Sequence, residues 1–96
     1  MSCLHTISQS PQQELLLTCS TVLQAGDAVL FLEDGVYHCM QYAAWPALDP
    51  AVKLFGLHAD MHARGVLSRN SQALEVVDYN GFVALCAEYD KVVSWF

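Results

Sequence analysis

The chain has 96 residues, of which 54% are hydrophobic and 15% charged, and its formal charge of -6 comes from ten acidic against four basic residues. The basic residues, Lys53, Arg64, Arg69 and Lys91, are scattered along the chain. This distribution argues against direct binding of nucleic acid. No charged leader and no apolar run of about 20 residues is present, so we expect a soluble, cytoplasmic protein.

The length predicts a single domain spanning residues 1–96. A domain this small has a high ratio of surface to volume. Its hydrophobic content is high for a protein that must cover so much surface with polar residues. Large exposed apolar patches on small domains mark interfaces. We therefore expect part of its apolar surface to face other subunits, against the alternative of a well-packed monomer.

The first elements expected are a strand, Cys3–Ile7, and a helix that follows it. Ser10 is the expected N-cap, Pro11 the first helical residue, and Gln13 completes a capping box. The apolar face of the helix repeats at helical spacing and comprises Leu15, Leu16, Cys19, Val22 and Leu23. Gly26 is expected to end this segment.

An unbroken apolar run within residues 27–37 predicts the second strand, at 29–32. A run without alternation is typical of a central parallel strand that is buried on both faces. It leads directly into Glu33 and Asp34, with Tyr37 close behind. Functional sites of parallel sheets gather beyond the carboxyl ends of the strands, so these three residues are expected at an interface or at the edge of a site.

Three elements are expected next: a helix at 36–44, a strand at 52–57 and a short helix at 60–63 closed by Gly65. A strand at 74–77 and a final strand at 92–96 are also expected. Between these two strands, Asp78 is expected to cap a helix that spans Phe82, Val83, Leu85 and Cys86. Turns are expected at 45–46 and 49–50, and a polar loop at 68–72. Strands that alternate with helices over short connections imply right-handed crossovers. The predicted fold is a three-layer, flavodoxin-like α/β domain with a mostly parallel five-stranded sheet.

Several chemical functions find little support in the sequence. A mononucleotide site after the first strand lacks a glycine for close phosphate approach, and Glu14 places a carboxylate there. We therefore expect no cofactor. His58 and His62 are four residues apart, but two ligands do not make a zinc site, so no metal is expected and a solvated or interface role is favoured. His5 is expected to be held in a turn near the functional edge rather than to act as a base.

The four cysteines have no CxxC spacing and are expected to be reduced thiols. Cys3 and Cys86 are expected in the core, and Cys39 could be exposed. Cys19 invites a chemical role, because a persulfide carrier needs one accessible cysteine with a favoured thiolate. Its place on the apolar helix face favours packing instead, as a small hydrophobic side chain.

Four segments in register resemble the TusB/DsrH family over essentially the whole chain. They are 4–11 (LHTISQSP), 32–37 (LEDGVY), 63–65 (ARG) and 77–79 (VDY), and they are followed by Phe82-Val83 and a terminal Trp95. The resemblance implies a subunit of a heterohexameric sulfur-relay complex with TusC/DsrF-like and TusD/DsrE-like partners. Sulfur would pass as a cysteine persulfide to a TusE/DsrC-like acceptor.

In the Tus branch, the resemblance implies support for 2-thiolation of the wobble uridine of tRNA. In the Dsr branch, it implies sulfur oxidation, where Cys19 matches a first-helix cysteine of DsrH-like members and would be a persulfide carrier. The main reactive cysteine of the family belongs to the TusD/DsrE subunit, which implies an accessory, non-catalytic role for this chain. An alternative of another class is a stand-alone ligand-binding domain, because fold alone does not determine function.

Overall fold

Five parallel strands form a single sheet in the computed structural model, which describes residues 2–9, 13–39, 51–69 and 74–95. The strands are β1 (Cys3–Ile7), β2 (Ala28–Phe31), β3 (Lys53–Leu57), β4 (Glu75–Val77) and β5 (Lys91–Trp95). Their order is β4-β3-β2-β1-β5, and every neighbouring pair is parallel. The predicted α/β architecture is confirmed, and the sheet is wholly rather than mostly parallel.

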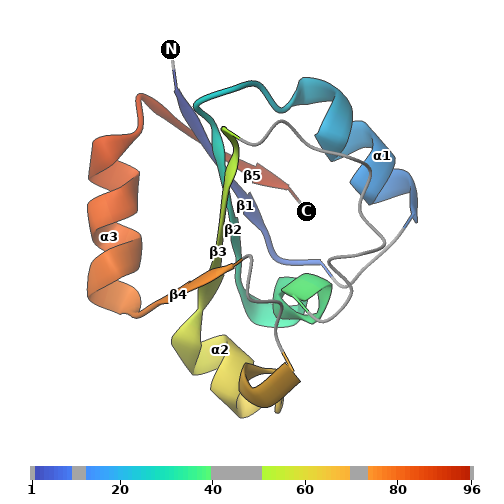
Figure 1. Cartoon of the computed structure of the whole chain (residues 1–96), viewed down its shortest axis with the longest axis vertical. Helices are drawn as coiled ribbons and strands as arrows, with labels where there is room; N and C mark the ends of the chain where they lie inside the picture. Colours follow the sequence, from blue (N-terminus) through green and yellow to red (C-terminus); the bar gives the residue numbers. More distant parts are fainter. Residues whose placement is uncertain (1, 10–12, 40–50, 70–73, 96) are drawn as a thin grey trace.

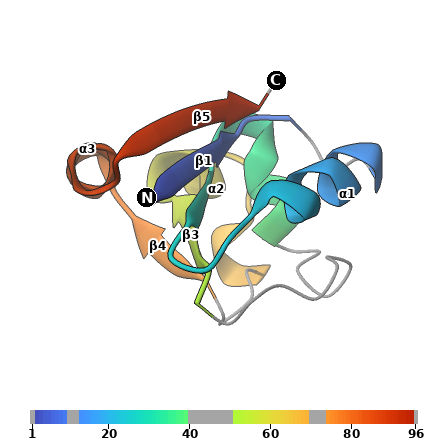
Figure 2. The ribbon, with the colours of Figure 1, turned by 90° about the horizontal axis from the view of Figure 1, so that it is seen from above.

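Helices cover both faces of the sheet. Helix α1 (Gln13–Val22) lies on one face and α3 (Tyr79–Glu88) on the other, as the views in Figures 1 and 2 agree. The short helix α2 (His58–Ala63) and the 3-10 segment η1 (Glu33–Cys39) lie at the end of the molecule to which β2 and β3 run. A second 3-10 segment, η3 (Leu67–Arg69), follows α2. Among the described residues, the structure contains no helix that could span a membrane.

The core consists of two apolar clusters, one on each face of the sheet. Strand β2 supplies both: Val29 and Phe31 pack on the side of α1, and Ala28 and Leu30 on the side of α3. All four side chains are fully buried. This explains why the strand is continuously apolar, because a central parallel strand has no solvent-facing side.

The element boundaries differ modestly from those expected. Strand β2 begins and ends one residue earlier than predicted, and α2 begins at His58, two residues earlier. The predicted helix at 36–44 is instead η1, and residues 40–44 lie outside the described ranges, as do Ser10, Pro11, both Pro-containing turns and most of the polar loop. Asp78 caps α3 as predicted, since its carboxylate accepts a hydrogen bond from the Gly81 amide at 2.8 Å.

The first helix also follows the prediction in part. Leu15 and Cys19 are buried in the core cluster on that side, and Leu23 packs against it. Val22, the last residue of α1, is exposed and does not belong to this buried face, contrary to the expectation. Gly26 and Gly65 both adopt positive φ angles, of 92° and 68°, in the turns where chain breaks were expected.

Candidate functional site

The turn after β2 is built against the end of β1. The Leu32 amide donates to the Ile7 carbonyl at 3.0 Å, and the Gly35 amide donates to the Leu32 carbonyl at 2.8 Å. A Cβ atom on Gly35 would lie 1.9 Å from the Ile7 carbonyl oxygen, a contact that no side chain can make. Glycine is therefore required here by the close approach of two backbone segments.

An exposed ion-pair network, which we call the Arg64 network, joins this turn to α2. The Arg64 Nε donates to Asp34 Oδ1 at 3.0 Å, and Arg64 Nη1 lies 3.6 Å from Asp60 Oδ1. The other oxygen of Asp60 accepts a hydrogen bond from the Glu33 amide at 2.7 Å. Glu33 has a φ of 50°, a left-handed conformation that costs energy for a residue with a side chain, and the Asp60 bond helps to hold it.

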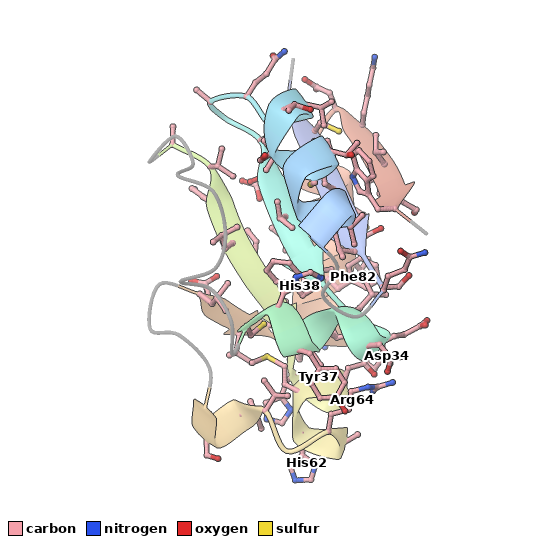
Figure 3. All side chains as sticks on the ribbon, turned by 90° about the vertical axis from the view of Figure 1, so that its right-hand side faces the viewer. Asp34, Tyr37, His38, His62, Arg64 and Phe82 are labelled. Atoms are coloured by element: carbon pink, nitrogen blue, oxygen red, sulfur yellow. The ribbon has the colours of Figure 1, made fainter. Side chains whose placement is uncertain are left out.

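Three of the four residues expected at the edge, Glu33, Asp34 and Tyr37, lie at the Arg64 network, and the fourth, His5, does not. Figure 3 shows Asp34, Tyr37 and Arg64 side by side. The hydrogen bond that Arg64 donates to Asp34 is the largest cause that raises the pKa of Arg64, and Asp60 and Tyr37 act in the same direction. The Asp34 side chain is 61% exposed, so its pairing is open to water and to partners. No group of three or more His, Cys, Asp or Glu side chains that could hold a metal ion occurs in the described residues.

Cys19, the candidate persulfide carrier, lies away from this edge. Its side chain is fully buried among the core residues between α1 and the sheet. Burial raises the pKa of its thiol to about 11. A sulfur atom in this environment is almost entirely a thiol at neutral pH, and the thiol is the unreactive form.

Two of the other three cysteines, Cys39 and Cys3, also lack the surroundings of a reactive thiolate. Cys39, which could have been exposed, is instead fully buried beside Gly56, and burial raises its pKa to about 12. Cys3 and Cys86 are half-buried rather than fully in the core. The pKa of Cys3 is raised, first by burial and then by the charge of Asp27.

A second polar group, the Asp27 network, was not predicted from the sequence. The indole Nε1 of Trp95 donates to His5 Nδ1 at 3.1 Å, which leaves the proton of the neutral imidazole on Nε2. His5 Nε2 then donates to Asp27 Oδ2 at 3.3 Å. The Asp27 carboxylate also accepts from the backbone amides of Cys3 and Gln24, at 3.0 and 3.1 Å.

The Asp27 network places His5 differently from the expectation. His5 lies inside β1, not in a turn at its end, and the His5 and Asp27 residues are each only 5% exposed. With both ring nitrogens engaged, His5 is a buried structural residue. The sequence did contain one signal for this network. Asp27 stands directly between Gly26 and an apolar strand, a position where a carboxylate can accept hydrogen bonds from nearby backbone amides.

The histidine pair on α2 occupies the solvent side of that helix. His58 and His62 are both exposed, and their rings are nearly parallel, with centroids 6.1 Å apart. His58 also lines an open hollow of about 400 Å³ together with Val76, Val77, Asp78 and Gly81. The hollow lies where α2 and α3 begin, beyond the carboxyl ends of β3 and β4.

These features define a small parallel α/β protein with an exposed polar edge and two fully buried thiols. A solution NMR structure of protein Tm0979 from Thermotoga maritima is similar to it, with a TM-score of 0.68, 18% sequence identity, and coverage of 90% of this chain and 92% of that one. This likeness shows the fold alone. The family model described as DsrH like protein matches residues 9–92.

Curated relatives agree with the family model. Protein TusB of Pectobacterium atrosepticum is 36% identical over 94 residues, which are 96% of this chain and 99% of that protein. Protein TusB of Serratia proteamaculans is 34% identical, and protein TusB of Escherichia coli O1:K1 is 29% identical, each with the same coverage. The chain belongs to the DsrH-like family, as its resemblance to TusB and DsrH proteins implied.

Proposed function

We propose that this chain is an assembly and positioning subunit of a cytoplasmic sulfur-relay complex that supports 2-thiolation of tRNA wobble uridine. Its partners would be TusC-like and TusD-like subunits in a heterohexamer, with a TusE-like sulfur acceptor. The persulfide would be carried by a partner subunit. The observation that carries this proposal is the burial of Cys19 and Cys39, which leaves both as unreactive thiols in a chain whose family relays sulfur.

The thiols argue against a carrier role for this chain. Two of the four cysteines are fully buried, with pKa values raised to about 11 and about 12. Attack on a sulfur donor requires a thiolate with access to the donor. Neither Cys19 nor Cys39 satisfies both conditions in the isolated chain, which favours the positioning role over the DsrH-type alternative with Cys19 as carrier.

Exposed apolar side chains support contact with partner subunits through α3 and β5. Tyr79 and Val83 lie four residues apart on one face of α3 and are 60% and 66% exposed. Val92 of the edge strand β5 is also exposed, and it is in register with Leu4, which packs on the side of α3. Apolar side chains in such positions are typical of interfaces that are covered in an assembly.

Co-purification tests the assembly role. The tagged chain from its native host is expected to elute with two partners of similar size in near-equal amounts. Val83→Glu should remove these partners, because it places a charge at the proposed interface. Val22→Glu is the matched control, since Val22 is also an exposed valine but lies on α1. Elution of the wild-type chain alone would refute the assembly role, and retention of partners by V83E would refute the assignment of the face.

Mass spectrometry of the purified complex tests which subunit carries sulfur. After incubation with a sulfur donor, we expect a gain of about 32 Da on a partner's cysteine and none on Cys19. Cys19→Ser should leave the rate of sulfur transfer unchanged. A persulfide on Cys19, together with a loss of transfer in C19S, would support the DsrH-type alternative instead.

A further inference from the structure

The histidine pair of α2 has no part in the function proposed above, and its spacing of four residues on a helix is the one that metal-chelating histidine pairs use. His58 and His62 are four residues apart on a helix, so their side chains project from the same face. Both side chains are exposed, and the two rings are inclined by only 12° with centroids 6.1 Å apart. We propose that His58 and His62 form a two-point binding site for a divalent transition-metal ion of the Ni²⁺, Cu²⁺ and Zn²⁺ class.

The distance between the rings is compatible with a shared metal. A metal–imidazole bond is about 2.0–2.1 Å long, so two nitrogens that share one ion lie about 3 to 3.5 Å apart. The ring centroids are 6.1 Å apart, so a shared ion requires rotations of the two side chains that turn one nitrogen of each ring toward the other. Since both side chains are exposed, these rotations displace no packed neighbour.

The helix beneath the pair is held in place by the rest of the structure. Met61, which lies between the two histidines in the sequence, is fully buried in the core, and the Arg64 amide donates to the Asp60 carbonyl at 3.2 Å to close the helix. Asp60 and Arg64 are in turn joined to η1 by the Arg64 network. The two histidines are therefore presented on a fixed backbone, which reduces the entropy lost on chelation.

The chemistry of the pair selects the class of ion. Neutral imidazole suits Zn²⁺, Cu²⁺ and Ni²⁺, while Mg²⁺ and Ca²⁺ prefer oxygen ligands. Only two protein ligands are assembled, so the ion keeps open coordination positions. The hollow beside His58 leaves room there for water or for a ligand of another molecule.

Ni²⁺ is the appropriate probe, because Cu²⁺ would oxidise the half-buried thiols of Cys3 and Cys86 and Zn²⁺ would bind them. Calorimetric titration of the whole chain with Ni²⁺ should give one site, and the same titration with Mg²⁺ should give none. His58→Gln and His62→Gln should each weaken Ni²⁺ binding at least tenfold. Glu88→Gln, which removes an exposed carboxylate of α3, should leave the affinity unchanged.

A second measurement separates chelation from loss of fold. Ni²⁺ should raise the Tm of the wild-type chain and of E88Q, because the ion binds the folded helix, and it should not raise the Tm of either histidine variant. The variants should have the wild-type Tm without the ion. Wild-type affinity for Ni²⁺ in both histidine variants, or no Ni²⁺ binding by the wild-type chain, would overturn the proposal.

Discussion

The Asp27 network and the Arg64 network are both polar clusters held by a carboxylate, but they differ in their access to water. In the first, Asp27 and His5 are each only 5% exposed, and the carboxylate accepts three hydrogen bonds. In the second, the Asp34 side chain is 61% exposed and shares Arg64 with Asp60. The same residue type is therefore structural in one place and available to partners in the other.

The contrast follows from the cost of removing a charge from water. A buried carboxylate is tolerated only when its hydrogen bonds are made, and breaking them leaves buried groups without partners. An exposed ion pair gains little, because water competes for both partners. Burial, rather than the presence of an ion pair, thus separates the residues that maintain the fold from those that can meet another subunit.

The largest effect is expected from Gly35→Ala at the turn that carries Asp34. The added Cβ would lie 1.9 Å from the Ile7 carbonyl oxygen, so β1 and η1 would have to separate. We expect a loss of about 3 kcal/mol or more in the free energy of unfolding, as in severe overpacking. Urea denaturation followed by circular dichroism measures it.

Gly65→Ala is the matched control for that variant. Gly65 has a φ of 68°, and no atom lies within 4 Å of its added Cβ, so only backbone strain of about 1 kcal/mol is expected. Equal losses in the two variants would show that the close approach at Gly35 is not what requires a glycine. A larger loss in G35A would show that the backbone contact beneath the exposed edge is what requires glycine at this position.

Asp27→Asn is expected to have the second largest effect. Asparagine has the same shape, but its amide group brings a donor to a position where the carboxylate accepts from Cys3, Gln24 or His5. At least one buried hydrogen bond is lost in either orientation of the amide, which should cost about 2–3 kcal/mol. Thermal and urea unfolding of D27N against the wild-type chain would detect it, and a loss below about 0.5 kcal/mol would contradict the structural role of the network.

The sequence allowed the fold to be predicted more completely than the polar networks. The apolar run that became β2 predicted a central parallel strand because burial on both faces leaves a direct mark on composition. Asp34 and Tyr37 were predicted at the edge because they follow that strand. The link between His5 and Trp95 could not be predicted, since it joins positions 90 residues apart through the pairing of β1 with β5.

The main local error of the secondary-structure prediction concerns η1. Like the missed link between His5 and Trp95, it arises from a contact between residues far apart in the sequence. Its expected helix began at Val36, whereas the 3-10 turns begin at Glu33. The Asp60 carboxylate, 27 residues later in the chain, accepts a hydrogen bond from the Glu33 amide, so the start of η1 depends on a tertiary contact rather than on a local capping signal. Likewise, Cys39 follows an exposed-looking turn in sequence but is buried because η1 folds back onto the sheet.

His38 sharpens the comparison, because it belongs to the segment of Asp34 but is buried like Asp27. Its ring stacks on Phe31, and Nε2 donates to the Gln9 carbonyl at 3.2 Å. Burial lowers the pKa of His38 below its ordinary value of 6.5, although the Gln9 bond acts in the opposite direction. As the pH falls below 6.5, His38 is therefore protonated in the unfolded chain before it is protonated in the folded chain.

The expected result is a fall in stability as the pH drops from about 6.5 through the lower pKa of folded His38. Urea denaturation at pH 7.5 and pH 5.5 should show this fall in the wild-type chain. His38→Phe should reduce it, whereas His62→Gln should retain it because His62 is exposed. An unchanged pH dependence in H38F would mean that other groups cause the effect.

The smallest effect is expected from Asp34→Asn, which makes the same chemical change as D27N but on the exposed edge. Arg64 keeps Asp60 as a partner, and the Asp34 side chain is mostly in water, so the loss in the free energy of unfolding should be below about 1 kcal/mol. Any larger consequence should appear in partner binding instead, measured as retention of the sulfur-relay partners on the tagged chain. A loss of stability in D34N equal to that in D27N would break the distinction between the two networks, because an exposed carboxylate would then contribute as much to the fold as a buried one.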